Sequence, residues 1–134
     1  MPKRGSIILL IGLLAAIVSL AACKGTVVNT QGQVPYELKR SMTAPNYWET
    51  FVNGDIETIH SAILAGIGDL GLTVKEDTYD KVSGIVEGSF ADNSNFTVKL
   101  AREADGTIQI RIKVGLTGNK DRSVQLFQAM STHF

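Results

Sequence analysis

The clearest pattern along the chain is an alternation of apolar and polar side chains near its C-terminal end. It runs from Ile108 to Val114, where every second residue is isoleucine or valine and the residues between them are polar. Side chains two positions apart in a strand point to the same face. The alternation therefore predicts a strand with one buried and one solvated face. Shorter versions of the pattern, separated by turn residues, predict further strands at 47–52, 72–79, 84–90 and 96–101.

Two segments have the spacing of amphipathic helices. In the first, isoleucines recur at helical spacing between Asp55, a typical N-cap residue, and Gly71, a typical residue after a helix end. Its apolar stripe consists of Ile56, Ile59, Ile63, Ile67 and Leu70. The second segment ends near Thr132, and its predicted apolar face consists of Val124, Phe127 and Met130, with Leu126 near the margin.

The order of these elements predicts the fold class. Strands that bury one face need a cover, and two amphipathic helices need a surface to pack on. We therefore predict an α+β fold in residues 47–134: an antiparallel sheet of four to five strands with two helices packed on one face. The other face of the sheet is expected to be open to solvent.

The first 22 residues have the three parts of a secretory signal peptide. Lys3 and Arg4 are positive, Ile7 to Leu20 is a mostly apolar run, and small residues follow. The apolar run is shorter than the roughly 18 residues that a membrane-spanning helix needs. We therefore predict a signal peptide over residues 1–22 that is removed from the mature protein.

The end of this segment indicates the type of signal peptide. Leu20-Ala21-Ala22-Cys23 resembles the lipobox of bacterial lipoproteins. The resemblance implies cleavage before Cys23 and acyl chains such as palmitate on this cysteine, the only one in the chain. Several acyl chains anchor a protein stably in a membrane. Lys24, where an aspartate would favour inner-membrane retention, implies an outer-membrane protein that faces the periplasm in a Gram-negative cell.

The segment between the anchor and the domain is polar and interrupted by glycine and proline. We predict that 23–46 consists of the lipidated cysteine and a flexible tether. A random coil of this length has an end-to-end distance of roughly 25 Å, which would lift the domain off the bilayer. A weak alternation of Val34, Tyr36 and Leu38 leaves open that part of the tether adds to a sheet edge.

The charge of the chain excludes some partners. Lysine and arginine together number 13, as do aspartate and glutamate. Loss of Lys3 and Arg4 with the signal peptide leaves 11 basic against 13 acidic residues, a net charge of −2. We therefore expect no nucleic-acid partner. A single cysteine excludes an intrachain disulfide and a zinc site built from several cysteines.

Short motifs fit catalytic or cofactor patterns without the context that these patterns need. Gly66–Gly71 fits G-x-G-x-x-G, but its glycines close a helix where a dinucleotide site would open one. We predict close helix packing at Gly66 and Gly68, and no cofactor. Glu57–His60 is half of a di-iron motif. His60 falls inside the apolar arc of the helix, so we expect it at the core margin and predict no metal site. The neighbouring Ser61 would face another way, so we expect no catalytic residue.

Four cationic residues alternate with the predicted core residues along their strands, so their side chains are expected to point to the opposite face of the sheet. They are Lys75, Lys99, Arg111 and Lys113. If their strands are neighbours, these residues form a basic patch in an otherwise acidic mature protein. Such a patch would suit an anionic glycan, lipid headgroups or an acidic protein partner of the envelope. The alternative is a solvated face whose charge is balanced by Asp77 and Glu87.

Two segments around glycine turns support a family resemblance. They are Asp69–Val74, after the first helix, and Ile110–Gly115 with Gly118, before the second. With these motifs, residues 47–132 resemble a family of small bacterial lipoproteins classed as a domain of unknown function. The resemblance implies the fold and the lipid anchor, and it supplies no catalytic residue.

Together these patterns predict a membrane-anchored envelope lipoprotein that is not an enzyme and acts as an interaction or accessory module. Its membrane contact would be the acyl chains on Cys23. One alternative is a carrier of a small apolar ligand between helices and sheet, which needs a cavity of at least a few hundred Å³. Another is a periplasmic hydrolase, which needs a cleft with converging polar groups.

Overall fold

A computed structural model of the chain describes residues 26–28 and 36–134. The predicted signal peptide and Cys23 lie outside the described residues. The described elements follow in the order β1 (Thr26–Val28), β2 (Tyr36–Arg40), β3 (Trp48–Val52), α2 (Ile56–Asp69), β4 (Thr73–Tyr79), β5 (Ser83–Ser89), β6 (Asn95–Arg102), β7 (Ile108–Val114) and α3 (Lys120–Ser131). Within these ranges, no helix is long and apolar enough to cross a bilayer.

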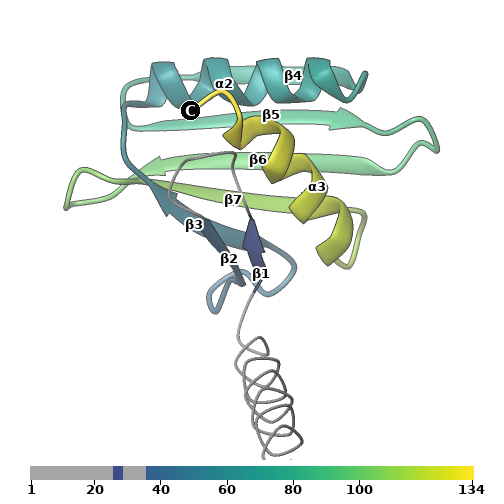
Figure 1. Cartoon of the computed structure of the whole chain (residues 1–134), viewed down its shortest axis with the longest axis horizontal. Coiled ribbons are helices and arrows are strands. Elements are labelled where there is room, and N and C mark those ends of the chain that lie inside the picture. Colours follow the sequence, from purple (N-terminus) through teal and green to yellow (C-terminus); the bar gives the residue numbers. More distant parts are fainter. Residues whose placement is uncertain (1–25, 29–35) are drawn as a thin grey trace, which may run out of the picture.

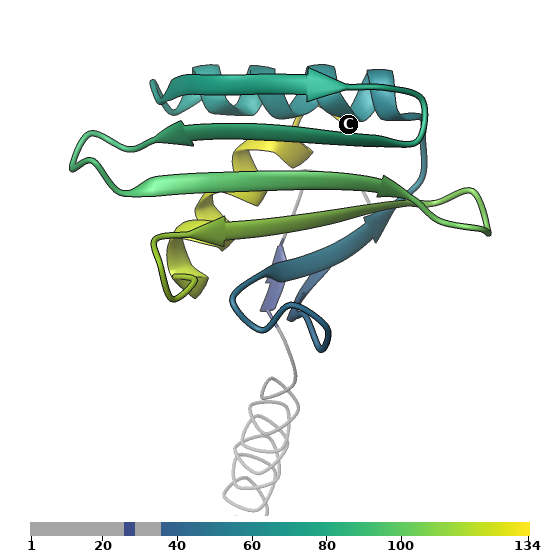
Figure 2. The ribbon, with the colours of Figure 1, turned by 180° about the vertical axis from the view of Figure 1, so that it is seen from behind.

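The strands form an antiparallel sheet with both helices on one face, which confirms the predicted α+β fold (Figure 1 and Figure 2). Strands β2 to β7 lie in the order β2-β3-β7-β6-β5-β4, and the short β1 pairs with the outer edge of β2. These six strands exceed the expected four to five because β2 forms within the segment predicted as a tether. Leu38 of β2 is fully buried, so the weak alternation there does mark a sheet edge.

The hydrophobic core lies between the sheet and the two helices. In β7, the four alternating apolar residues are each at most 1% exposed, which confirms the strand predicted at Ile108–Val114. The helix side chains of the core are Ile56, Ile59, Ile63, Ile67, Leu126, Phe127 and Met130. The buried face of α3 is rotated relative to the prediction, since Leu126 is fully buried and Val124 only partly so.

Helix α2 begins and ends at the predicted residues. The Asp55 carboxylate accepts a hydrogen bond of 2.7 Å from the backbone N–H of Thr58. This bond stabilises the ionised form and lowers the pKa of Asp55 below its ordinary value. Gly71 has a φ of +67°, a conformation that glycine adopts without strain after a helix. The two caps therefore set the length of α2 between β3 and β4.

Helices α2 and α3 approach each other most closely at Gly66. A Cβ atom at this position would lie 2.5 Å from the backbone nitrogen of Met130. Only a residue without a side chain fits there, which confirms the packing predicted at Gly66. The same prediction is wrong for Gly68, where an added Cβ would meet nothing within 4 Å.

Alanine at each of these two glycines tests the helix contact. Gly66→Ala should lower the free energy of unfolding by about 1–3 kcal/mol, because the added methyl group forces the helix backbones apart. Gly68→Ala should raise it by up to about 1 kcal/mol, because alanine favours the helix and meets no neighbour. Urea denaturation followed by circular dichroism measures both. Effects of the same sign and size would contradict the contact assigned to Gly66.

Candidate functional site

Figure 2 shows the face of the sheet that no helix covers, here called the open face. In β7, Gln109, Arg111 and Lys113 point to this face, since the residues between them are buried. In the register of β6 with β7, Lys99 pairs with Arg111, and Thr97 pairs with Lys113. The structure therefore brings three of the four predicted patch residues together. We call Lys99, Arg111 and Lys113 the basic cluster.

Tyr47, the residue before β3, lies against two of these cations. The Nζ atoms of Lys99 and Lys113 are 5.1 and 5.2 Å from the centroid of its ring. A cation over an aromatic ring at an exposed site gains about 0.5–1 kcal/mol. The ring therefore offsets part of the repulsion between the two ammonium groups. Tyr47 was not predicted as a site residue. The only sequence feature that points to it is its position two residues before Glu49, which places both side chains on the same face of the strand.

Arg111, the third member of the basic cluster, has a carboxylate partner. It lies opposite Glu49 in the register of β3 with β7, and its Nε donates to Glu49 Oε2 at 3.0 Å. Its Nη2 donates to Thr43 Oγ1 at 2.6 Å. Glu49 is thus the acidic residue that balances part of the cluster. Asp77 and Glu87 were predicted to balance the charge of the patch. Asp77 lies on the opposite face, where it contacts His60, whereas Glu87 lines a hollow on the open face.

Lys75, the fourth predicted patch residue, lies apart from the basic cluster. It belongs to β4, which β5 and β6 separate from β7, at a β-bulge between Val74 and Glu76. Its Nζ donates to Asn95 Oδ1 at 3.1 Å. Lys75 and Lys113 nevertheless line the same hollow, so Lys75 faces the cluster across that hollow.

Two hollows open on this face beside the basic cluster. One, of about 690 Å³, adjoins Lys113, and its polar side chains include Lys75, Glu87, Asn95 and Thr97. The other, of about 390 Å³, adjoins Lys99 and Arg111, and its polar side chains include Thr78, Ser83 and Gln109. The open face thus combines cations with amides and hydroxyls. These groups can donate hydrogen bonds to carboxylates and to sugar hydroxyls.

His60 lies on the helix side of the sheet, where it joins α2 to the edge strand β4. It is 5% exposed, its Nε2 hydrogen-bonds to the Asp77 carboxylate, and its ring stacks on Tyr79 with centroids 4.2 Å apart. This confirms the predicted position at the core margin. In residues 36–134, no serine, threonine or cysteine hydrogen-bonds to His60, and no group of three or more His, Cys, Asp or Glu residues could hold a metal ion.

The contact between His60 and Asp77 can be tested by a change that keeps the shape of the side chain. Asp77→Asn should lower the free energy of unfolding by about 1–3 kcal/mol, because a buried ring nitrogen loses its charged partner. Glu76→Gln is the matched control, since this neighbour points to the open face; its effect should stay within about 0.5 kcal/mol. Equal losses in the two variants, measured by urea denaturation, would contradict a specific contact.

These features define a small α+β domain that keeps one face of its sheet open and partly basic. The chain belongs to the DUF3568 family of proteins of unknown function, whose model matches residues 4–133. The match therefore includes most of the predicted signal peptide as well as the domain. A search of curated proteins finds no match to this chain.

Proposed function

We propose that this protein is a lipid-anchored lipoprotein of the cell envelope whose open face binds an anionic glycan. The observation behind the proposal is the basic cluster, in which Lys99, Arg111 and Lys113 are neighbours on the uncovered face. Like charges directly opposite each other in a sheet are destabilising. In a mature chain of net charge −2, a polyanionic ligand accounts for cations that are grouped at one place.

The two lysines are the members of the basic cluster best placed to meet a ligand. Arg111 already donates to Glu49 and Thr43, whereas Lys99 and Lys113 both lie over the Tyr47 ring. Amides and hydroxyls in the adjoining hollows would bind sugar hydroxyls. Attraction between exposed charges is screened beyond roughly 8–10 Å at physiological salt. The binding is therefore weak, micromolar or above, and sensitive to salt.

The proposed anchor rests on the order of features at the N-terminus. A positive start, an apolar run and a boundary at the chain's single cysteine, Cys23, occur in the sequence in which a lipoprotein signal requires them. Lys24 supports a position on the outer membrane, facing the periplasm. The family match, which begins at residue 4, is consistent with a leader and a domain that belong together.

Packing of the core favours binding on the open face over transport of a ligand inside the domain. The side chains of the hydrophobic core are 0–3% exposed, and α2 and α3 are in backbone contact at Gly66. The two hollows described above lie on the open face. Its cations, amides and hydroxyls also suit recognition better than hydrolysis, for which we identify no nucleophile beside His60 within residues 36–134.

Lipidation is tested by moving the only thiol of the chain. Cys23→Ser should abolish labelling of the protein by a fatty-acid analogue in a bacterial host, because the acceptor sulfur is gone. Cys23→Ser combined with Met42→Cys restores a thiol on an exposed loop and should also stay unlabelled. Persistent labelling of the Cys23→Ser protein would contradict the proposed anchor.

Glycan binding is tested by co-sedimentation of the soluble form, beginning at Lys24, with purified peptidoglycan sacculi. Reversal of the basic cluster to Lys99→Glu, Arg111→Glu and Lys113→Glu should weaken binding roughly tenfold or more, since each exposed pair contributes up to about 1 kcal/mol. Glu49→Gln should strengthen binding by about two- to fivefold, because it removes the competing carboxylate.

A triple reversal outside the open face is the matched control for these changes. It consists of Lys81→Glu, Arg102→Glu and Lys120→Glu, which alter the net charge by the same amount. Circular dichroism first confirms that each variant is folded. Equal weakening by the two triple reversals, or binding that is independent of salt, would show that the basic cluster is not the binding site.

A further inference from the structure

The first described strand begins close to the proposed lipid anchor. Thr26, the first residue of β1, is three positions after Cys23. Because an extended chain spans at most about 3.6 Å per residue, the Cα atoms of these two residues lie within roughly 11 Å of each other. Pairing with β2 holds Thr26 on the domain. An anchor at Cys23 would therefore keep the domain against the bilayer. The flexible tether predicted from the sequence would instead allow a separation of roughly 25 Å.

The register of β1 shows which end of the sheet the anchor approaches. Thr26 pairs with Leu38, two residues before β2 ends at Arg40. The chain therefore enters β1 at the end where the β2–β3 loop, residues 41–47, projects from the sheet (Figure 1). The β7–α3 loop, residues 115–119, packs against this loop, since a Cβ atom on Gly118 would collide with the backbone oxygen of Asn46.

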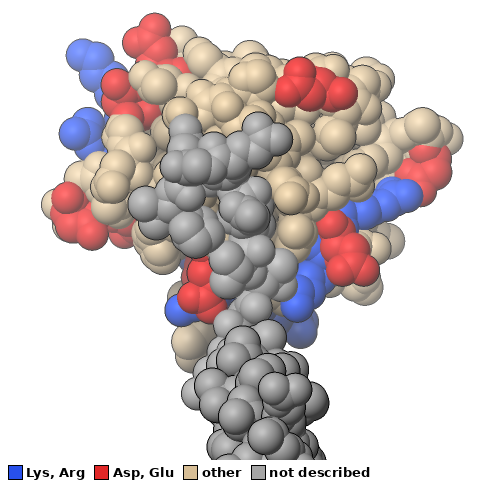
Figure 3. Space-filling view, viewed as in Figure 1, with Lys and Arg blue, Asp and Glu red and all other residues tan. Residues whose placement is uncertain are grey.

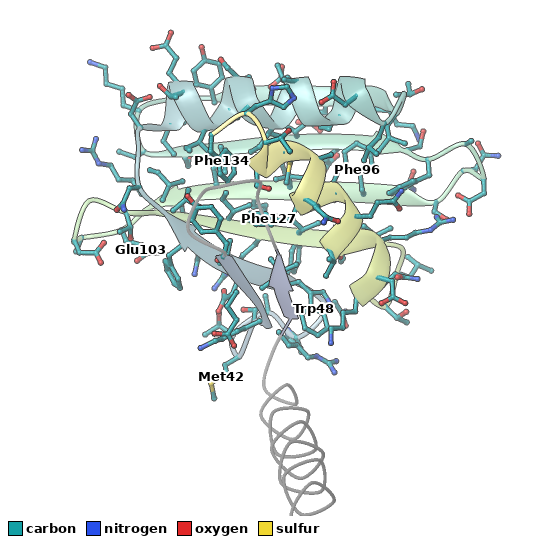
Figure 4. The ribbon with its side chains drawn as sticks, in the orientation of Figure 1. Met42, Trp48, Phe96, Glu103, Phe127 and Phe134 are labelled. Carbon is teal, nitrogen blue, oxygen red and sulfur yellow. The ribbon has the colours of Figure 1, made fainter. Side chains whose placement is uncertain are left out.

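These two loops carry two very exposed apolar side chains. Met42 is 97% exposed in the β2–β3 loop, and Leu116 is 92% exposed in the β7–α3 loop. The other large apolar side chains that reach the surface of the described chain are 41–60% exposed. Figure 4 shows Met42 pointing away from the domain at the end where β1 begins. Both side chains are free of packing on loops that touch each other, so both are available to insert into an apolar medium.

Cations accompany the apolar side chains at this end. The Arg40 Nε donates to the Pro45 carbonyl at 2.7 Å, which fixes the loop and leaves the guanidinium at the surface. The Lys120 Nζ lies 5.4 Å from the centroid of the Trp48 ring. Figure 3 shows lysine and arginine side chains along this lower edge of the domain, with acidic side chains between them. Basic residues with an aromatic ring beside them favour the headgroup region of an anionic bilayer.

We propose that the β2–β3 and β7–α3 loops form a surface that docks on the phospholipid bilayer holding the anchor. Met42 and Leu116 insert among the headgroups and upper acyl chains, while Arg40 and Lys120 contact lipid phosphates. This inference rests on the proposed anchor at Cys23, which delivers the docking surface to the membrane. None of the four residues belongs to the basic cluster. The docking surface borders the open face, since Leu116 also lines the hollow beside Lys113. Docking at this lower edge of the view in Figure 2 leaves the rest of the open face uncovered.

The lipidated full chain provides the test, because its only native thiol would be acylated and an introduced cysteine is then the single free thiol. Met42→Cys and Leu116→Cys place a fluorescent label on the docking surface. Val82→Cys and Glu103→Cys are the controls, since the exposed Val82 and the partly exposed Glu103 lie in loops at the other end of the strands. Each protein is reconstituted into vesicles of phosphatidylethanolamine and phosphatidylglycerol, with and without a lipid that carries a spin label near its headgroup.

Labels at 42 and 116 should be quenched by the spin-labelled lipid at least twofold more than labels at 82 and 103. Leu116→Asp should reduce the quenching at 42, because it places a charge in the same membrane contact. Equal quenching at all four positions, in protein that floats with the vesicles, would overturn docking and leave the anchor standing.

Two further outcomes would also overturn the inference. Failure of the protein to float with vesicles would refute the anchor itself, and docking with it. Shielding of the label at 42 that persists without lipid and rises with protein concentration would assign this surface to a second copy of the chain.

Discussion

The alternation in β7 is the constraint on which the rest of the structure depends. This strand lies between β3 and β6, with four apolar side chains under the helices and three polar ones on the open face. A register shift of one residue would exchange the two sets and place Arg111 and Lys113 in the core. Burying an unpaired charge costs on the order of several kcal/mol. The hydrophobic core and the basic cluster are therefore two results of the same pattern.

Local signals were sufficient to predict most elements of the fold. Both ends of α2 follow from Asp55 and Gly71, and the strands follow from period-two alternation. Position in the sheet was the missing information. Every residue of β4 is exposed, so Val74 is not buried as its alternation suggested, because β4 is an edge strand with a bulge. Strand β2 was difficult to predict for a similar reason, since it buries Leu38 alone among its residues.

Alternation along each strand predicted which face of the sheet the site residues occupy, but not which strands lie next to each other. Parity placed Lys99, Arg111 and Lys113 on one face, and the structure shows them as neighbours. Their partners Tyr47, Glu49 and Thr43 could not be predicted, because nothing local shows that β3 lies beside β7, which is distant in the chain. The bulge in β4 also matters, since it changes the faces of the residues that follow it. Asp77 consequently lies with His60 on the helix side, away from the cations it was expected to balance.

The two proposed surfaces adjoin, because Thr43 and Tyr47 of the β2–β3 loop contact the basic cluster, and their combination bears on how a weak site can be effective. A domain docked at a bilayer remains in a thin layer beside it, so its open face meets an envelope glycan at a high effective concentration. Docking also limits the directions in which that face can point, which a tether of roughly 25 Å would not do. The acyl anchor would hold the domain at the membrane permanently, and the docking surface would fix its orientation. The basic cluster then needs only a contact that forms and breaks readily, which suits two lysines beside an arginine already paired with Glu49.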